Sequence, residues 1–325
     1  MKNPTNKSSA SAKITNKDNL KRGIMMKVGI IGAGSIGLLF ASYISRVLDV
    51  TIYTRTSKQA QEINKNGIKL RNGGNERVTM VRAQPIGMWT GTENFTIIAV
   101  KQYQLLPIIE KINQLSAVPE HLLFLQNGMG HLKLLEGVRA NDLYVGSVEH
   151  GALKENSTTV SHNGNGVTNV AVFKGTAVSL QQLVSELNGE FPMVLHEDFY
   201  PMLIKKLIVN AVINPLTALL QVKNGVLIKN RFYFQAVQKV FAEISFILNL
   251  EQPEEYLRLV IEICKNTEDN RSSMFKDMEA NNLTEIDAIL GYLLDEAEKQ
   301  EKEAPQLSIL YHFIKGKELD REGAL

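Results

Sequence analysis

The strongest indication of the fold is the segment KVGIIGAGSIG at residues 27–37. Its apolar start predicts a short strand, and the glycines that follow have the spacing Gly-x-Gly-x-x-Gly and lead into a helix. In this setting the first glycine makes a tight turn, the second lets a pyrophosphate approach the backbone, and the third lets the helix pack on the sheet. Free N–H groups at the helix N-terminus can bind the phosphates, although a purely structural turn is the alternative. The predicted cofactor-binding residues of this turn are Gly32, Gly34, Ser35, Ile36 and Gly37.

The residues after the next predicted strand distinguish NADP(H) from NAD(H). An enzyme that prefers NAD places an acidic side chain about 20 residues after the glycine turn, where it binds the ribose hydroxyls. Here the sequence Tyr-Thr-Arg-Thr-Ser-Lys occupies positions 53–58 and contains no acid. Arg55 and Lys58 can bind a 2′-phosphate, and Thr54 or Ser57 can donate a hydrogen bond to it. The sequence predicts NADP(H), with a solvated basic loop as the alternative.

Two regions of different character follow one another along the chain. Residues 26–195 alternate strand and helix signals, and the uninterrupted apolar run at 96–100 is typical of a buried parallel strand. Asn-Gly-Gly-Asn at 72–75 predicts a hairpin turn. Helical periodicity dominates later, with helices predicted at 200–221, 231–249, 254–267, 285–302 and 307–319. The sequence therefore predicts an α/β Rossmann-type dinucleotide-binding domain at 26–195, followed by an all-α C-terminal domain at 196–325.

The first 25 residues are polar and rich in Lys, Asn and Ser, which predicts a disordered N-terminal tail at 1–25. Basic residues followed by an apolar run also resemble a signal peptide, which is the alternative. The glycines within that run favour a turn over a membrane-inserted helix. No other continuous apolar stretch is long enough to span a membrane, so we expect no membrane association.

The composition is that of an ordinary globular protein and excludes several classes of function. Of the 325 residues, 44% are hydrophobic and 22% are charged, which permits a sizeable core. A net charge of +2 is too balanced for a nucleic-acid-binding protein. The single cysteine, Cys264, excludes an intrachain disulfide and a multi-cysteine metal site, which favours a cytoplasmic location. His150 and His162 lack a third ligand at suitable spacing, so we expect packed or surface histidines and no metal.

A polar stripe crosses the otherwise apolar segment 203–220. Lys206, Asn210 and Asn214 recur at every fourth position and therefore fall on one face of a helix. Burying an ammonium and two amides costs on the order of several kcal/mol unless each finds a partner, so the stripe indicates a site where something polar binds. Lys205 competes with Lys206 for the role of catalytic lysine, but it is rotated by about 100° away from the two asparagines.

Three further motifs accompany the stripe. Val-Lys-Gln-Tyr-Gln at 100–104 and Gln-Asn-Gly-Met-Gly at 126–130 each end a predicted strand, where ligands gather in open α/β sheets. Asn-Arg-Ser-Ser-Met occupies 270–274 and precedes Glu285 in the sequence Thr-Glu-Ile-Asp. In this order, and combined with the stripe and its extension to 217, the motifs resemble those of the ketopantoate reductase (2-dehydropantoate 2-reductase) family. The resemblance covers the chain outside the N-terminal tail.

The resemblance implies a Rossmann domain joined to a helical domain, with the active site in the cleft between them. It implies that Lys206 is the catalytic lysine and acts as a general acid. The implied substrate-binding residues are Asn127, Asn210, Asn214, Ser273 and Glu285. The implied cofactor-binding residues outside the glycine turn are Arg55, Lys101 and Asn127.

By the same resemblance, the expected activity is NADPH-dependent reduction of 2-dehydropantoate (ketopantoate) to (R)-pantoate in the synthesis of pantothenate (vitamin B5) and coenzyme A. Ser273 and Glu285 favour a short substrate that carries both a carboxylate and a hydroxyl. Two rivals stay open because a fold does not determine the substrate: a reductase of another 2-keto acid, and a protein that senses NADPH without turnover. We expect a small-molecule substrate and no nucleic acid, and a homodimer through the helical domain stays open.

Overall fold

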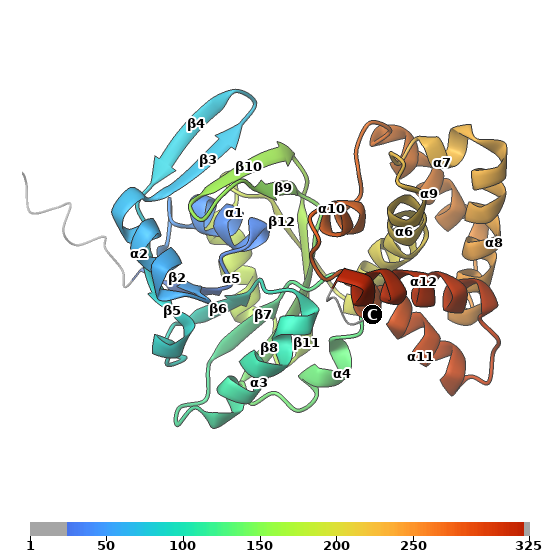
Figure 1. The fold of residues 1–325 in the computed structure, drawn as a ribbon. Coiled ribbons are helices and arrows are strands. Elements are labelled where there is room, and N and C mark those ends of the chain that lie inside the picture. The colour runs from blue at the N-terminus through green and yellow to red at the C-terminus, as the bar shows by residue number, and fades with distance from the viewer. Residues whose placement is uncertain (1–24, 322–325) are drawn as a thin grey trace, which may run out of the picture.

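The computed structural model describes residues 25–321. Residues 1–24 of the predicted tail, which include most of the basic part of the alternative signal peptide, therefore fall outside the described residues. Figure 1 shows a sheet-rich region built from the first part of the chain and a helical region built from the second part. This order confirms the predicted fold class, an α/β region followed by an all-α region.

An eight-stranded sheet runs through the first region in the order β12-β11-β8-β7-β6-β1-β2-β5. Neighbouring strands from β8 to β5 are parallel, whereas β11 is antiparallel to β8 and parallel to β12. The strand order reverses at β1, and sheets of this kind bind ligands above the carboxyl ends of the strands at such a point. The strands are β1 (Lys27–Ile31), β2 (Asp49–Thr54), β5 (Arg82–Pro85), β6 (Phe95–Ile98), β7 (His121–Phe124), β8 (Asp142–Val148), β11 (Thr168–Lys174) and β12 (Met193–His196).

A second, four-stranded sheet covers helix α1 (Ser35–Ile44) on the side away from the large sheet, in the order β4-β3-β10-β9 (Figure 1). Its strands are β3 (Ile68–Asn72), β4 (Asn75–Thr79), β9 (Gly151–Lys154) and β10 (Thr159–Gly164). The predicted turn between β3 and β4 is confirmed, but the parallel pairing of β3 with β10 was not predicted. Because α1 lies between two sheets, every residue from its third to its last is buried.

The remaining elements of the first region are short helices beside the large sheet. They are α2 (Ser57–Asn66), η1 (Ile86–Met88), η2 (Gln102–Gln104), α3 (Leu105–Gln114), α4 (Leu132–Leu135) and α5 (Val178–Leu187). The sequence did not predict β5, β9, α5 or β12. The three strands have only four residues each, and β5 and β12 pair with strands more than 20 residues away, so their structure depends on pairing rather than on a strong local pattern.

Helix α6 (Phe199–Leu220) is the central element of the second region. The side chain of Asp198 accepts a hydrogen bond from the Tyr200 N–H and so caps the helix N-terminus. Helix α6 packs against α8, α9, α10 and α12, and also against strands β8 and β11 of the large sheet. The other helices are α7 (Val226–Lys229), α8 (Arg231–Leu248), α9 (Pro253–Asn266), α10 (Ser273–Glu279), α11 (Tyr292–Lys299) and α12 (Pro305–Arg321).

Among the described residues, α6 is the one helix that is long and apolar enough to cross a membrane by length and composition. In the structure, 67% of its most apolar window is buried against the rest of the protein. The packing of α6 is therefore that of a core helix.

The helix predicted at 285–302 differs from the structure at both ends. It begins with a π-helical turn, η3 (Asp287–Gly291), and its α-helical part ends at Lys299. The hydroxyl of Thr284 accepts a hydrogen bond from the Ile286 N–H at 3.2 Å, just before the helical segment begins at Ile286. Turns of this wide type are rare in proteins and occur frequently at functional sites.

Candidate active site

The glycine turn after β1 has the geometry that each of its glycines predicts. Gly32 has a φ of +107°, and a Cβ on Gly37 would lie 1.7 Å from the Gly32 carbonyl oxygen, so α1 packs directly on the turn. A Cβ on Gly34 would meet no atom within 4 Å. The first turn of α1 contains no acidic residue and its N-cap has no side-chain hydrogen bond. Open space beside free N–H groups fits the pyrophosphate of a dinucleotide.

The end of β2 presents basic groups beside this turn. Arg55, Ser57 and Lys58 are exposed, and Arg55 makes no ion pair with another described residue. Thr54, in contrast, is fully buried and its hydroxyl donates to the backbone oxygens of Thr56 and Gln84, at 2.8 and 3.4 Å. The prediction that Thr54 can donate to a 2′-phosphate is therefore wrong, because its side chain points into the fold. The exposed side chains of Arg55, Ser57 and Lys58 stay available to bind a 2′-phosphate.

A charged cluster joins the two regions of the chain. The Lys101 ammonium, just beyond β6, lies 2.7 Å from the Asp277 carboxylate and 3.3 Å from the Glu285 carboxylate. The Asn127 amide, just beyond β7, donates to the same oxygen of Glu285 at 2.8 Å. Burial lowers the pKa of Lys101, but Glu285 and Asp277 together outweigh it and hold the pKa above its ordinary value. Lys101 is therefore a permanent cation that fixes the buried carboxylate of Glu285.

Two glycines bring the strand end and the π-helical turn into backbone contact. Gly128 has a φ of +74°, and a Cβ there would lie 2.1 Å from the carbonyl oxygen of Ala288. That oxygen accepts hydrogen bonds from the N–H groups of Met129 and Gly130, at 3.1 and 3.3 Å. The Asn-Gly-Met-Gly motif thus docks the sheet onto η3, and this docking places Asn127 against Glu285.

Lys206 reaches from α6 to the large sheet. Its ammonium donates to the Val148 carbonyl oxygen, at the end of β8, at a distance of 2.5 Å. Burial lowers the pKa of Lys206 to about 8, although Glu285 and Glu149 oppose this shift. Lys205 is exposed to solvent and makes no comparable contact. This difference supports the choice of Lys206 over Lys205 that helical geometry predicts.

The remaining predicted substrate-binding residues, Asn210 and Asn214 on α6 and Ser273 on α10, form no side-chain bond to the charged cluster. Asn210 is half-buried and Asn214 is 5% exposed, and neither side chain makes a hydrogen bond to another described residue. The start of α10 is tied to α6 because Thr217 donates to Ser272 at 2.8 Å, while Ser272 accepts from the Phe275 N–H. Ser273 is exposed in the first turn of α10. Both amides and the Ser273 hydroxyl therefore remain free to bind a ligand.

Several contacts at this junction were not predicted from the sequence. Asp277 lies one helical turn beyond Ser273, so the helical pattern could have suggested that it shares the same side of α10. Lys154 and Gln59 both donate to the Ala33 carbonyl oxygen of the glycine turn, each at 3.0 Å. No sequence signal points to Lys154, because it approaches the turn from the unpredicted small sheet.

The two histidines lie inside the first region as packed side chains. The Nδ1 atom of His150 lies 3.2 Å from the Nε2 atom of His162, and the Nδ1 atom of His162 lies 2.9 Å from the Tyr43 hydroxyl. Burial lowers the pKa of His150 to about 4, with smaller contributions from His162 and Lys206. No cluster of three or more His, Cys, Asp or Glu side chains suited to a metal was found within residues 25–321. The histidines thus match the expectation of packed residues.

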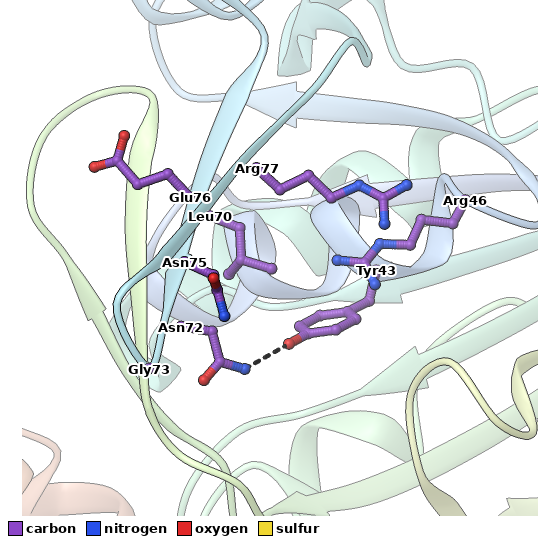
Figure 2. Close-up of a pocket in the computed structure, with 8 residues that line it drawn as sticks. All are labelled: Tyr43, Arg46, Leu70, Asn72, Gly73, Asn75, Glu76 and Arg77. Carbon is purple, nitrogen blue, oxygen red and sulfur yellow. Dashed lines mark hydrogen bonds between the residues drawn. The ribbon is translucent and has the colours of Figure 1, made fainter.

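A cavity of about 370 Å³ lies beyond Tyr43, between α1 and the β3–β4 hairpin (Figure 2). Arg46 and Arg77 line it together with the Tyr43 ring, and the Arg46 guanidinium stacks over that ring at 4.3 Å. None of the residues predicted to bind cofactor or substrate lines this cavity. It is therefore separate from the junction described above.

Comparisons with known proteins agree with this architecture. A family model described as ketopantoate reductase PanE/ApbA matches residues 28–175, and a model for the C-terminal part of the same family matches residues 198–318. The 2-dehydropantoate 2-reductase of Bacillus subtilis (strain 168) is 41% identical over 297 residues, which cover 90% of this chain and 98% of that protein. The corresponding protein of Listeria monocytogenes is 36% identical over 300 residues, covering 90% of this chain and 97% of that protein.

Solved structures lead to the same family. The crystal structure of the probable 2-dehydropantoate 2-reductase from Bacillus subtilis, with 41% sequence identity, matches 90% of this chain and 100% of that chain with a TM-score of 0.81. A ternary structure of D-mandelate dehydrogenase with NADH and anilino(oxo)acetate has a TM-score of 0.82 over 91% of this chain and 99% of that chain. Its identity is 22%, so it supports the fold alone. Family models and relatives together cover nearly all described residues, and the chain therefore belongs to the ketopantoate reductase family.

Proposed function

We propose that this chain catalyses the NADPH-dependent reduction of ketopantoate to (R)-pantoate, a step of pantothenate and coenzyme A synthesis. The observation that carries the proposal is that Lys206 lies at the carboxyl end of β8 within the electrostatic reach of Glu285, a carboxylate that Lys101 and Asn127 also bind. Relatives named 2-dehydropantoate 2-reductase match this chain over 97–98% of their own length.

The chemistry needs a proton donor at the ketone oxygen. Bound NADPH supplies the hydride, held by the glycine turn and Arg55 with Lys101 and Asn127 on its side of the junction. Lys206 donates the proton to the oxygen that gains negative charge, and its ammonium stabilises that charge more strongly in the transition state than in the ketone. Its carbonyl partner Val148 holds the side chain in place, and a pKa of about 8 makes the proton easier to transfer near neutral pH.

The remaining residues orient the substrate. The Glu285 carboxylate accepts from the substrate hydroxyl, and its contacts with Lys101 and Asn127 hold that carboxylate in position. Ser273 donates to the substrate carboxylate. The side-chain amides of Asn210 and Asn214, which make no hydrogen bond to another described residue, hold the substrate or the lysine from α6.

The test of this function is the oxidation of NADPH, followed by its absorbance, with purified protein and ketopantoate. NADH and pyruvate serve as comparisons. Turnover that requires both NADPH and ketopantoate would support the reductase. Tight NADPH binding without turnover on ketopantoate would favour one of the two rivals, and a panel of other 2-keto acids would separate a different reductase from a sensor.

The pH dependence of kcat/KM for ketopantoate is expected to report Lys206. A general acid must carry its proton, so kcat/KM should be constant at lower pH and fall tenfold per pH unit above about 8, the pKa to which burial lowers this lysine before the substrate binds. The measurement is kcat/KM for ketopantoate at saturating NADPH between about pH 6 and 10. A rate that stays constant up to pH 10 would remove Lys206 as the proton donor.

Replacement of Arg55 by alanine is expected to weaken NADPH much more than NADH. A hydrogen bond to a charged group contributes about 1.5–3 kcal/mol, so the Kd for NADPH should rise roughly tenfold to a hundredfold. NADH lacks the 2′-phosphate, and its Kd should change little. Isothermal titration with both cofactors measures the two constants, and equal weakening of both would contradict the assignment of Arg55.

Three further features belong to this proposal. The chain is divided into a cofactor-binding domain at 26–195 and a domain at 196–325 that binds the substrate and carries the catalytic lysine.

The protein acts in the cytoplasm, in keeping with its one buried, unpaired thiol at Cys264. It forms a homodimer through the helical domain; a structural relative from Staphylococcus aureus, 20% identical, is described as a dimeric ketopantoate reductase. Light scattering after size-exclusion chromatography gives the oligomeric state directly.

A further inference from the structure

Lys154, the last residue of β9, connects the small sheet to the glycine turn. Its backbone N–H donates to the Ser35 hydroxyl at 3.1 Å, and its ammonium donates to the Ala33 carbonyl oxygen at 3.0 Å. Both partners belong to the turn that is expected to hold the cofactor. The small sheet therefore places a cation on this turn, although its strands lie outside the βαβ unit that supplies the turn itself.

Gln59 fixes the same hairpin from the other side. Its amide donates to the Ala33 carbonyl oxygen at 3.0 Å and to the Ser157 carbonyl oxygen, in the β9–β10 connection, at 2.9 Å. The Gly32 N–H donates to the Tyr53 carbonyl oxygen at 2.9 Å, which ties the turn to the end of β2. Lys154 is thus held beside the end of β2, where Arg55 follows.

Lys154 and Arg55 bring two positive charges to this place without a counter-ion. Neither makes an ion pair with a carboxylate among residues 25–321. The adjacent acid, Glu155, makes no ion pair with Lys154 or Arg55. Its carboxylate instead pairs with Arg71 and accepts a hydrogen bond from the Ser161 hydroxyl. Burial and then the Arg55 guanidinium lower the pKa of Lys154, as expected for a cation without a carboxylate partner. Two neighbouring cations without a carboxylate partner among the described residues can together bind an anionic group of a ligand.

We propose that Lys154 is the second cation of the 2′-phosphate site and, with Arg55, makes the protein select NADPH over NADH. This inference rests on the proposed use of NADPH. A phosphate monoester carries nearly two negative charges at neutral pH, which matches two cations. The N–H groups at the start of α1 are the better binding site for the pyrophosphate. The Lys154 ammonium lies at Ala33, next to the end of β2, where the 2′-phosphate is expected.

The experiment measures binding rather than turnover. Isothermal titration compares 2′,5′-ADP with 5′-AMP, which lacks the 2′-phosphate, and NADPH with NADH. The proteins are the wild type, Lys154→Met, Lys154→Arg and the control Lys65→Met. Lys65 is an exposed lysine in the last turn of α2, so its replacement makes the same change in net charge away from the turn.

Lys154→Met is expected to raise the Kd for 2′,5′-ADP and NADPH about tenfold to a hundredfold, as expected for loss of a charge-assisted hydrogen bond. The Kd for 5′-AMP and NADH should change less than about twofold, Lys154→Arg should keep most of the affinity, and Lys65→Met should match the wild type. Equal losses for all four ligands would mean that Lys154 only supports the turn, and no loss would mean that it does not touch the cofactor; either result overturns the inference. A wild type that binds NADPH and NADH equally would instead refute the proposed cofactor, whatever Lys154 does.

Discussion

Replacing Lys206 by alanine is expected to lower kcat for ketopantoate reduction by about 10²–10⁴-fold, the usual contribution of a positioned general acid. The Kd for NADPH should stay within about twofold of the wild type, because the glycine turn and Arg55 lie on other elements. The stability of the fold should not fall strongly, since the variant removes a partly buried charge whose burial is unfavourable. Steady-state kinetics and cofactor titration measure the two effects separately.

Lys205→Ala is the matched control for this experiment. Lys205 is the neighbouring lysine on the same helix, but it is exposed to solvent. Its loss should leave both kcat and cofactor affinity close to the wild type. If Lys206→Ala keeps near-normal turnover, or if the two variants lose activity equally, Lys206 is not the proton donor.

Glu285→Gln is expected to have two effects that a structural residue would not combine. It should lower kcat/KM for ketopantoate roughly tenfold to a hundredfold, because the acceptor for the substrate hydroxyl loses its charge. It should also move the alkaline decline of kcat/KM to lower pH. The direction follows from the two influences on the pKa of Lys206: burial lowers it and the Glu285 carboxylate raises it. Without that carboxylate the pKa of Lys206 falls further, so the lysine loses its proton at a lower pH.

The pH profiles of the wild type, Glu285→Gln and a control, Glu254→Gln, test this expectation. Glu254 is an exposed acid in the first turn of α9, so its replacement makes the same chemical change away from the junction. An alkaline decline that stays at the wild-type pH in Glu285→Gln would show that the carboxylate does not act on Lys206. Asp277 still pairs with Lys101 in this variant, which should keep the junction folded.

The parts of the fold that depend on local patterns could be predicted from the sequence. The glycine turn, the parallel strand β6 and the face of α6 that carries Lys206 each arise from residues close together in the chain. The small sheet could not be predicted in this way. Its central pairing joins β3 to β10 across about ninety residues, and strands as short as β9 carry little periodic signal.

The site shows the same division between local and distant information. Family resemblance assigned Glu285 to the substrate and Lys101 to the cofactor, but the ion pair between them and the additional partner Asp277 depend on how two regions dock. Thr54 was predicted wrongly because a sequence does not show which way a hydroxyl at a strand end turns. Lys154 was missed because its position depends on the small sheet.

The geometry of the active site depends on the number of residues in the π-helical turn at Asp287–Gly291. A turn of this kind holds one residue more than an α-helical turn, so a deletion of one residue there would restore ordinary α geometry. Helix α11 could keep its packing, yet everything before the deletion would rotate by about 100° around the axis. Glu285 would leave Lys101, and the carbonyl of Ala288 would leave the Asn-Gly-Met-Gly loop. In the evolution of this chain, insertions and deletions should therefore be tolerated in the connections between helices and selected against within these five residues.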